Sequence, residues 1–377
     1  MRIVQIITCL NDGGAEGILF NICKNDDKNK HIVISLMDKG KYGPLLDNLG
    51  IKVYCLNMKP NIFSIFSIFH LVKILISLKP DIVQTWLIHG DFIGGIAARL
   101  AGIKNIIWNV RYSKLEIAKT KISSILLIKL LSKLSFLIPK SIIVVSKSAH
   151  KNCVKLNYSK KKLFLIPNGY DLTILNLSKT KRAFIRKKWK IKKQTPVIGN
   201  VARYDPKKDH MNLLSALSII RLRNMDFICI LVGSNIDKKN KNLVSEIKRL
   251  NLSKYIKLLG QKKNISQVMN GLDIYVQSSS NGEGFPNVVA EAMACGTPCV
   301  VTDVGDAAFI VGKTGLVVSP KNPIKLAKAI EFTLNEVSSK SWINKSNQAR
   351  LRIKNNFDIS KMLKSYNKVW VKTLSVN

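Results

Sequence analysis

Paired cysteines are absent from this sequence. Its seven Cys residues are scattered, and no two form a C-x-x-C pair, which argues against a zinc ribbon and against a disulfide framework. Isolated Cys residues are usually small buried hydrophobic side chains, and we expect that role for most of them. The first residues, MRIVQIITCLNDGG, also lack a small-residue cleavage site after their short apolar run. We therefore predict a first strand instead of a signal peptide, and a protein that stays in the reducing cytoplasm.

Acidic residues are scarce. The 377 residues include 23 Asp and Glu against 61 Lys and Arg, a net charge of +38. Such a charge attracts anionic partners, such as nucleic acid, anionic membranes or phosphorylated ligands. Only eleven of the basic residues are Arg, and the chain is rich in Lys, Ile and Asn, so a genome-wide composition bias is the alternative source of the excess. Aromatic residues are not interleaved with Lys and Arg on one face, which argues against a nucleic-acid surface.

Long apolar runs are also missing. Residues 62–78 form an apolar stretch of 17 residues, but it contains His70 and Lys73 and is shorter than the ~20 residues that a bilayer-spanning helix needs. We predict an ordinary packing helix there. Residues 121–140 differ, because on a helical projection their Lys and Ser side chains share one arc, and Leu, Ile and Phe cover most of the rest. The arc holds Lys121, Ser124, Lys129, Ser132, Lys133 and Ser135. Two interpretations stand: a helix that lies on an anionic leaflet, or one buried in its domain.

Strand-like and helix-like segments alternate along the chain, which is the pattern of parallel sheets covered by helices. The predicted strands are residues 3–9, 31–36, 51–56, 81–86, 105–110, 141–145, 163–166, 195–202, 226–232, 255–259, 272–277, 297–301 and 316–318. In the second half, helices are predicted at 208–223, 239–250, 263–270, 286–295 and 322–334. A Lys-rich stretch interrupts the alternation. We predict a first domain at 1–175, a connection at 176–194, a second domain at 195–357 and a final helix at 358–377. Two doubly wound domains imply a cleft between them, with ligands at the carboxyl ends of the strands.

Three phosphate-binding patterns are missing. No G-x-G-x-x-G follows a predicted strand, no G-x-x-x-x-G-K-[ST] occurs, and no D-x-D pair is present to hold a divalent ion on a diphosphate. Instead, Arg203 and Lys208 lie five positions apart in the loop NVARYDPKKDH, after the first strand of the second domain. A guanidinium and an ammonium at this place are predicted to form a metal-free clamp for a diphosphate. We expect neither a metal nor a cofactor.

The segment NGEGFPNVVAEAMACGTP, residues 281–298, carries two carboxylates. Pro286 suits the first position of a helix and Gly296 its end, so Glu291 lies in the helix and Glu283 before it. The free N–H groups at the start of such a helix attract phosphate. Positions eight apart rise ~12 Å along a helix, so the spacing does not impose the ~5–10 Å between the carboxyl groups of a glycosidase pair. We predict separate roles for the two carboxylates.

The segments LNDGGAEGILFNI, VARYDPKKDH and GLDIYVQSSSNGEGFPNVVAEAMACGTPCVVTDVGD together resemble glycosyltransferase family 4, the glycosyl transferases group 1. The resemblance covers essentially the whole chain. It implies the α/β fold called GT-B, in which two doubly wound Rossmann-like domains face a cleft and the C-terminal helix packs back on the first domain. It also implies a metal-independent transfer of a sugar from a nucleotide sugar, with retention of the anomeric configuration. Glu283 is a weak candidate for a nucleophile, so we favour front-side attack by the acceptor hydroxyl.

The resemblance assigns roles to single residues in the second half. Arg203 and Lys208 match the basic pair that holds the donor diphosphate. Glu283 matches a residue near the donor sugar, and Glu291 matches a carboxylate that accepts hydrogen bonds from the ribose. The backbone of the sugar and phosphate pocket corresponds to Gly284, Phe285, Pro286 and Asn287.

In the first half the resemblance is looser. Gly13 and Gly14 match a glycine loop beside the donor phosphates, and His89 matches a histidine near the reacting centre, for which a purely structural role is the alternative. Arg111, in WNVRYSK, lies at a predicted cleft edge, where it would meet a lipid-linked pyrophosphate or pair with a carboxylate. We expect the acceptor to be selected by residues of this half, namely Trp86, His89, Asp91, Asn109, Arg111 and residues 112–140.

These expectations combine into one predicted function. The donor is a nucleotide sugar, expected to be a UDP-sugar carrying a hexose or N-acetylhexosamine, and the acceptor is a polyprenyl-diphosphate-linked or other oligosaccharide. The basic amphipathic segment and the charge predict peripheral association with the inner face of the cytoplasmic membrane, and bacterial O-antigen or capsule assembly as the setting. A sugar-nucleotide epimerase of similar architecture and a basic nucleic-acid-binding protein are the alternatives.

Overall fold

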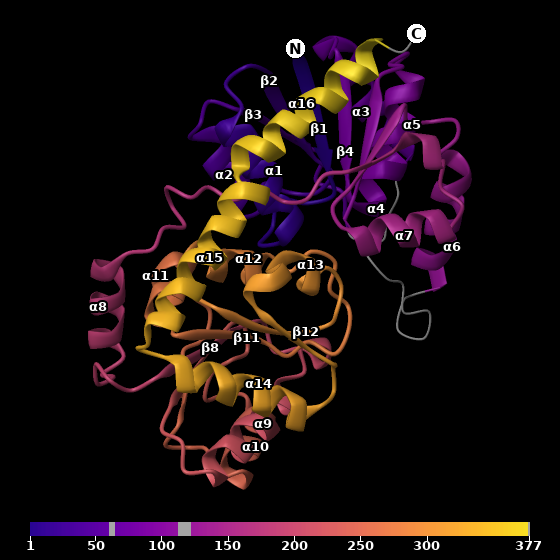
Figure 1. Cartoon of the computed structure of the whole chain (residues 1–377). Helices are drawn as coiled ribbons and strands as arrows, with labels where there is room; N and C mark the ends of the chain where they lie inside the picture. The colour runs from indigo at the N-terminus through magenta and orange to yellow at the C-terminus, as the bar shows by residue number, and fades with distance from the viewer. Residues whose placement is uncertain (60–64, 112–121, 376–377) are drawn as a thin grey trace. The chain divides into compact units, whose positions relative to one another are not determined.

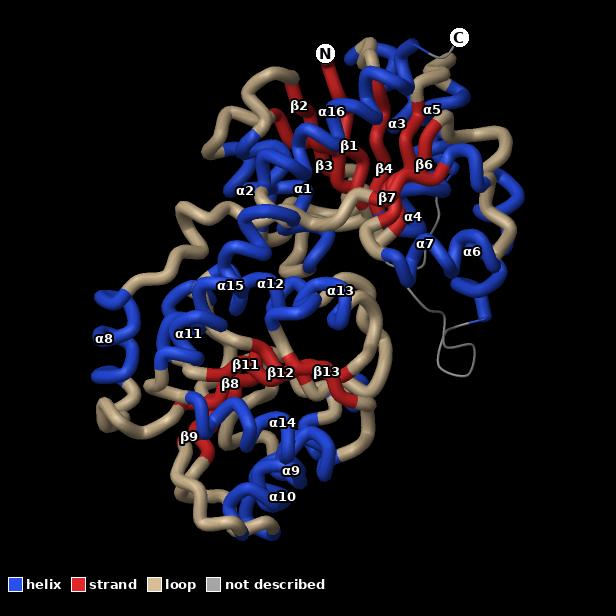
Figure 2. Tube along the Cα trace, in the orientation of Figure 1, coloured by secondary structure: helices blue, strands red, loops and turns tan. Residues whose placement is uncertain are grey.

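The computed structural model describes residues 1–59, 65–111 and 122–375. The chain divides into two compact units, Met1–Gly169 with Ile359–Asn377, and Tyr170–Asp358. Each unit has a parallel sheet with helices on both faces (Figures 1 and 2). The prediction of two doubly wound α/β domains is therefore confirmed. The final helix, α16 (Ile359–Ser375), packs within the first unit, also as predicted.

The sheet of the first unit is built around β1. Its strand order is β3-β2-β1-β4-β5-β6-β7, and every pairing is parallel. The strands are β1 (Arg2–Ile7), β2 (Lys30–Ser35), β3 (Lys52–Cys55), β4 (Ile82–Trp86), β5 (Ile106–Val110), β6 (Ser141–Val144) and β7 (Leu163–Leu165). The strand order reverses between β1 and β4, and the loops that follow these two strands carry Gly13, Gly14 and His89. The reversal point of an open α/β sheet is where ligands bind.

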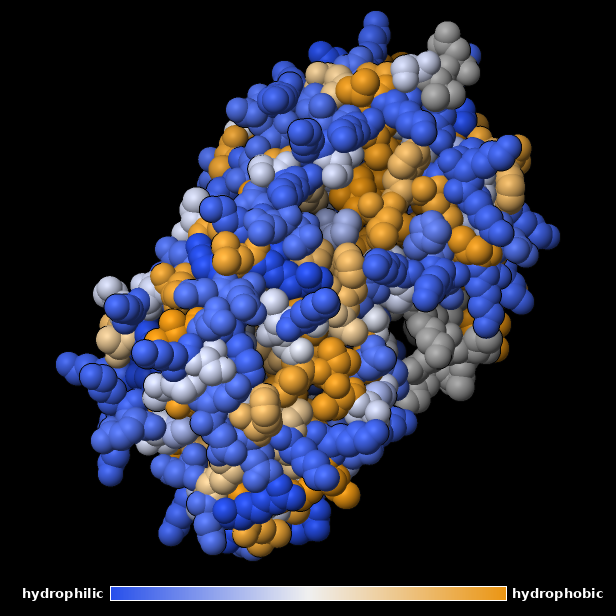
Figure 3. Space-filling model, viewed as in Figure 1, coloured by the Kyte–Doolittle hydropathy of each residue, from blue (hydrophilic) through white to orange (hydrophobic). Residues whose placement is uncertain are grey.

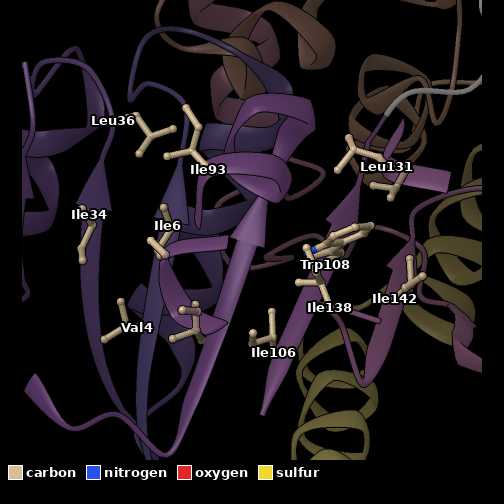
Figure 4. Close-up of a cluster of buried hydrophobic side chains, with 14 of the residues drawn as sticks. Val4, Ile6, Ile34, Leu36, Ile93, Ile106, Trp108, Leu131, Ile138 and Ile142 are labelled. Atoms are coloured by element: carbon tan, nitrogen blue, oxygen red, sulfur yellow. The ribbon is translucent and has the colours of Figure 1, made fainter. Parts of the chain in front are cut away.

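Two hydrophobic layers enclose this sheet. On one face lie α1 (Gly14–Asn25), α2 (Tyr42–Asp47) and α16, and on the other lie α3 (Ile65–Leu78), α5 (Gly95–Leu100), α6 (Ile122–Leu134) and α7 (Lys147–Lys155). The second layer is drawn in Figure 4, where Ile6 of β1, Trp108 of β5 and Leu131 of α6 belong to one buried cluster. Shorter elements are α4 (Leu87–His89), the π-helix Gly90–Gly94 and the 3-10 helix Lys160–Lys162.

The second unit repeats the plan with six strands. The order is β10-β9-β8-β11-β12-β13, again with parallel pairings. The strands are β8 (Val197–Val201), β9 (Ile228–Val232), β10 (Ile256–Leu258), β11 (Ile274–Gln277), β12 (Cys299–Thr302) and β13 (Leu316–Val318). The helices are α8 (Lys179–Lys188), α9 (His210–Leu222), α10 (Lys241–Arg249), α11 (Ile265–Gly271), α12 (Asn287–Ala294), α13 (Ala307–Val311), α14 (Pro323–Glu336) and α15 (Lys340–Asn356), with 3-10 helices at Pro206–Lys208 and Gly312–Thr314. Helices α9, α10 and α14 cover one face and α11 and α12 the other (Figure 2).

All thirteen predicted strands are present, with ends within two residues of the prediction, as are the five helices predicted in the second half. The predicted domain limits were less accurate. The first unit ends at Gly169 instead of residue 175, and residues 176–194 are not a connection but part of the second unit. They contain α8, which packs against α11 through the buried Ile185 and Trp189. The six Lys and Arg residues in this ten-residue helix concealed that buried side.

The predicted orientation of the segment 121–140 was wrong in part. Lys121 lies outside the described residues, and Lys129 and Lys133 are exposed as expected, but Ser132 and Ser135 are buried. The hydroxyl of Ser135 donates to the carbonyl of Ser132 and accepts from the backbone N–H of Ser159, which fixes this side inward. The outer side consequently carries exposed apolar residues, which are Ile122, Leu126, Leu130, Phe136 and Leu137.

Two other predictions are confirmed. Residues 65–78 form the packing helix α3, with Leu71 and Leu75 buried, whereas residues 62–64 lie outside the described part of the chain. All seven Cys residues are free, and five of them are buried. Within the described ranges, no helix combines the length and the apolar character needed to cross a membrane. Hydrophilic residues cover most of the face drawn in Figure 3, with hydrophobic ones gathered in smaller patches.

Candidate functional site

In the second unit, hydrogen bonds join the loop after β8 to the loop after β11. Because parallel strands end at the same edge, the residues after Val201 and Gln277 lie close together. Ser278 donates its hydroxyl to the carbonyl of Lys208 at 2.9 Å, and the backbone N–H of Ser280 donates to the carbonyl of Lys207 at 2.9 Å. The run of three serines after β11 therefore holds the loop that carries the predicted diphosphate clamp.

Lys208 and Glu283 meet at this edge. The ammonium Nζ of Lys208 lies 2.6 Å from Oε1 of Glu283, and the hydroxyl of Ser279 donates to the same oxygen at 2.6 Å. The side chains of Lys208 and Glu283 are 23% and 10% exposed. Two residues assigned to separate parts of the donor are thus joined by an ion pair.

Arg203 lies in the same loop but has a different partner. Its guanidinium donates twice to Oδ2 of Asp205, at 3.2 and 3.1 Å, and its side chain is 65% exposed. The clamp predicted from Arg203 and Lys208 is therefore divided between two carboxylates in this structure. An exposed ion pair of this kind contributes little stability, so Arg203 is able to exchange Asp205 for a ligand.

The loop before α12 has a fixed shape. Gly282 and Gly305 have φ of 74° and 62°, in the left-handed region that favours Gly. A Cβ on Gly305 would lie 2.5 Å from the carbonyl oxygen of Glu283, and the N–H of Asp306 donates to the carbonyl of Gly284 at 2.9 Å. Gly305 thus lets the loops after β11 and β12 touch, and Gly282 leaves room for the side chain of Lys207. Pro286 is the residue before α12 and not its first helical position, one residue from the prediction.

Two residues far away in sequence support this loop. The hydroxyl of Tyr170 donates to Oδ1 of Asn287 at 2.7 Å, and the ring of Phe357 packs edge-on against Phe285 at 5.6 Å between centroids. Tyr170 and Phe357 lie at the two places where the chain passes between the units, and they are joined by a backbone hydrogen bond of 2.8 Å. No local motif marks them, so the sequence analysis missed both.

Glu291 differs sharply from Glu283. Within the described part of the chain it has no hydrogen-bond or ion-pair partner, and burial raises the pKa of its carboxyl group to about 7. The residue retains some accessible surface. An unpaired, desolvated carboxylate is costly unless a ligand supplies donors, so its environment is that of a binding residue.

Further buried side chains at this edge have polar atoms that make no hydrogen bond to any described residue. Asn200 and Gln277 on the strands, and His210 and Asn212 at the start of α9, each have a buried polar atom with no hydrogen bond. Burial lowers the pKa of His210 to about 4, and the nearby Lys208 acts in the same direction, so the imidazole is neutral at pH 7. The sequence analysis did not select these residues, although an Asn and a Gln inside buried strands are an unusual signal.

In the first unit, Gly13 and Gly14 begin α1. Gly13 is the residue that precedes the helix, and a Cβ at this position would overlap the carboxylate of Glu16. Glu16 is buried and lies in the first turn of α1, where a negative charge is favoured by the helix dipole. A larger residue at position 13 would therefore require the Glu16 side chain to move.

His89 lies in a locally unusual backbone. Leu87 has φ of 68°, uncommon for a residue with a Cβ, and a π-helix, Gly90–Gly94, follows directly. Both features concentrate at functional sites. His89 is half-buried, and burial lowers its pKa. These observations favour a functional role for His89 over a purely structural one.

The other predicted acceptor residues are mostly interior. Trp86, Asp91 and Asn109 are at most 1% exposed, and burial raises the pKa of Asp91 to about 8 although Thr85 donates to it. They are unavailable as direct acceptor contacts. Residues 112–121, part of the predicted acceptor segment, lie outside the described residues.

Arg111 is held at the end of β5. Its guanidinium donates to Oδ1 of Asn168 at 2.5 Å and to the hydroxyl of Tyr366 at 2.8 Å, and it stacks over Trp86 at 4.7 Å from the ring centre. These three contacts are with neutral groups.

No group of three or more His, Cys, Asp or Glu side chains in the described residues is arranged to hold a metal ion. The site is instead built from cations, carboxylates and backbone N–H groups. Residues 181–350 match the family Glycosyl transferases group 1, and residues 12–174 match Glycosyltransferase Family 4. The chain belongs to glycosyltransferase family 4. Membership of this family identifies the protein as a glycosyltransferase. It argues against the two alternatives, an epimerase and a nucleic-acid-binding protein.

Individual family members are similar over most of the chain. The Escherichia coli enzyme UDP-Gal:alpha-D-GlcNAc-diphosphoundecaprenol alpha-1,3-galactosyltransferase is 28% identical over 291 residues, 73% of each chain. The Staphylococcus aureus capsular polysaccharide biosynthesis glycosyltransferase CapH is 24% identical over 306 residues, 78% of each. Among solved structures, Anabaena HepE in complex with UDP matches with a TM-score of 0.87 and 21% identity, over 99% of this chain and 100% of that one. The fold is therefore the predicted GT-B fold.

Proposed function

We propose that this glycosyltransferase moves a hexose or an N-acetylhexosamine from a UDP-sugar to a glycan carried on a polyprenyl diphosphate. In this proposal the reaction retains the anomeric configuration, needs no metal and belongs to bacterial surface polysaccharide assembly. The names of the relatives support it: the E. coli enzyme uses UDP-Gal and a diphosphoundecaprenol-linked sugar, CapH acts in capsule synthesis, and HepE binds UDP.

The environment of Glu291 is the main support for a nucleotide sugar as the donor. A carboxylate with no protein partner and a raised pKa gains most from a ligand that offers two hydroxyl donors, as a ribose does. The same helix begins four residues after Glu283, and its free N–H groups suit a phosphate. Lys208 and the exchangeable Arg203 supply cations for the diphosphate, which removes the need for a metal ion.

The proposed chemistry is electrostatic. As the bond between sugar and UDP breaks, negative charge grows on the diphosphate, and preorganised cations lower the barrier by binding it. Glu283 already accepts hydrogen bonds from Lys208 and Ser279, which makes it a poor nucleophile. Front-side attack by the acceptor hydroxyl is therefore the proposed route to retention. Isolation of a glycosyl-enzyme on Glu283 after incubation with donor would contradict it.

The proposed polyprenyl-diphosphate-linked acceptor implies that the protein works on the cytoplasmic face of an anionic membrane. Helices α3 and α6 cover the same face of the first sheet, with α5 in contact with α3 and with Arg99 donating to the carbonyls of Leu137 and Ile138 after α6. Large exposed apolar residues lie on this layer, and Lys73, Lys129 and Lys133 lie among them. The apolar residues are Phe66, Phe69, Ile76, Leu100, Ile122, Leu126, Leu130, Phe136 and Leu137. Apolar side chains ringed by lysines suit an anionic leaflet.

The reaction is tested by mass spectrometry with a panel of UDP-sugars, with and without a synthetic polyprenyl-diphosphate-linked sugar. We expect transfer with one donor only when the acceptor is present. Isomerisation of a donor without acceptor would favour an epimerase, and transfer to a free oligosaccharide only would overturn the lipid-linked acceptor. The panel also identifies the sugar.

The membrane part is tested separately with vesicles of phosphatidylglycerol and phosphatidylcholine. We expect salt-reversible co-sedimentation with the anionic vesicles, lost in the double variant Lys129→Glu/Lys133→Glu. The charge-matched control is Lys241→Glu/Lys248→Glu on α10, where both side chains are exposed. An equal loss in both variants would mean that binding follows net charge and not this layer.

A further inference from the structure

The serine run after β11 makes a different contact with each of its residues. Ser278 holds the carbonyl of Lys208 through its hydroxyl, and Ser280 holds the carbonyl of Lys207 through its backbone N–H. Ser279 alone contacts a side chain of the site, the carboxylate of Glu283. Ser278 and Ser279 are 0% and 2% exposed. The outer serines therefore fix the backbone of the loop, and the middle one acts on a charged group.

Ser279 is itself held in place. Its carbonyl accepts the hydroxyl of Thr302 at 2.6 Å, a residue at the end of β12. Its hydroxyl and the ammonium of Lys208 both lie 2.6 Å from Oε1 of Glu283. One carboxylate oxygen thus has a charged donor on a long flexible side chain and a neutral donor on a short rigid one.

The ammonium of Lys208 and the hydroxyl of Ser279 respond differently when a nucleotide sugar binds, if the proposed function holds. A diphosphate competes for the ammonium of Lys208, because it carries more negative charge than a carboxylate. Glu283, only 10% exposed, then loses the charged hydrogen-bond donor on its Oε1, and the loss of a donor to a buried carboxylate is unfavourable. The hydroxyl of Ser279 has no such competitor and stays on the carboxylate.

We propose that Ser279 is a positioning residue that keeps the Glu283 carboxylate in place while Lys208 turns to the donor diphosphate. This inference rests on the proposed function. Without the hydroxyl, Oε1 of Glu283 would lose both of these hydrogen-bond donors when Lys208 turns, and the carboxylate would move away from the sugar. In the ion pair, a movement of Lys208 would also move Glu283. With Ser279 present, Lys208 can neutralise the leaving diphosphate while Glu283 keeps its contact with the sugar.

The test compares Ser279→Ala with Ser280→Ala. Ser280 is the matched control, because it is the next residue and its hydroxyl makes only a 3.5 Å contact with the Lys207 carbonyl. For Ser279→Ala we expect kcat to fall about 10- to 100-fold, the cost of one hydrogen bond to a charged group, with the KM for the donor changed less than about threefold. Ser280→Ala should leave both unchanged.

A double-mutant cycle with Glu283→Gln decides whether the effect passes through Glu283. Ser279→Ala should cost little or nothing further in the Glu283→Gln protein, because the carboxylate it holds is gone. An equal loss of kcat in both backgrounds, or an unchanged kcat in Ser279→Ala, would overturn the proposal. The same cycle measured by thermal unfolding needs no substrate. Wild-type protein that transfers no sugar overturns the proposed function, and the unfolding cycle then decides on the Ser279–Glu283 pairing alone.

Discussion

At the scale of single residues, the two carboxylates of the segment 281–298 have opposite environments. Glu283 accepts two short hydrogen bonds, whereas Glu291 has no partner in the described residues and a pKa of about 7. The sequence showed that two carboxylates eight positions apart need not act as a pair. It did not show the difference between them, because that depends on Lys208, which is 75 positions away from Glu283.

This difference predicts an asymmetric result for two substitutions. Glu291→Ala should weaken UDP binding by about tenfold or more, since hydroxyl bonds to a charged acceptor are lost, with a smaller effect on kcat at saturating donor. Glu283→Ala should mainly lower kcat. Calorimetric titration with UDP and steady-state kinetics separate the two. Equal losses of affinity and turnover in each variant would contradict separate roles.

The raised pKa of Glu291 also predicts a pH dependence of donor affinity. Ribose hydroxyls donate to the ionised carboxylate, so binding favours loss of the proton, and affinity should fall as the pH drops through about 7. Well below that pH the Kd for UDP should rise about tenfold per pH unit. Glu291→Gln is the control, because titration of the nucleotide itself appears in both proteins. A parallel profile in the two would show that Glu291 does not contact the ligand.

The same pKa shift predicts that Glu291 lowers stability at neutral and higher pH. Its folded-state pKa of about 7 lies above the ordinary value of 4.5, so the cost is absent below pH 4.5 and complete above pH 7. Glu291→Gln should therefore raise the free energy of unfolding by about 3 kcal/mol at pH 8 and leave it nearly unchanged at pH 4.5. Urea unfolding at the two pH values measures this. A gain of the same size at both would assign the effect to packing.

At the scale of elements, the sequence was sufficient to predict the strands but not which side of each helix is buried. Most strands could be predicted because buried parallel strands are runs rich in Ile and Val. The inward side of a helix depends on its neighbours. In α6, Ser135 is buried by bonds to Ser132 and Ser159, and in α8, Arg182 and Arg186 point to a buried Asp273. Neither arrangement follows from hydropathy.

The α8 contact predicts a large stability effect. Asp273 is 2% exposed and accepts hydrogen bonds from Arg182, Arg186 and the N–H of Val197. Asp273→Ala leaves a buried guanidinium unpaired and should cost about 3–5 kcal/mol in the free energy of unfolding. The control is Glu246→Ala, whose ion pair with Arg249 on α10 is largely exposed, with an expected loss of at most about 1 kcal/mol. Similar small losses in both would show that α8 is not fixed by this pair.

At the scale of the whole molecule, the chain passes between its two units twice, at Gly169–Tyr170 and at Asp358–Ile359. Tyr170 and Phe357 are joined there, and their side chains contact Asn287 and Phe285 of the donor loop. The loop is therefore supported by the residues that connect the units. Sequence reasoning located the loop through its motif, but its support comes from positions that only the fold brings together.

The return of α16 to the first unit has a consequence for biosynthesis. Residues 170–358, the whole second unit, leave the ribosome before α16 does, so that unit is complete first although it is second in the sequence. Until α16 appears, α1 and α2 alone cover the face of the first sheet on which Tyr366 and Trp370 are buried, and the part that α16 covers stays exposed to water. Domains usually finish folding in the order in which they are made. Here the first half must wait, partly folded and exposed to aggregation, for the last residues of the chain.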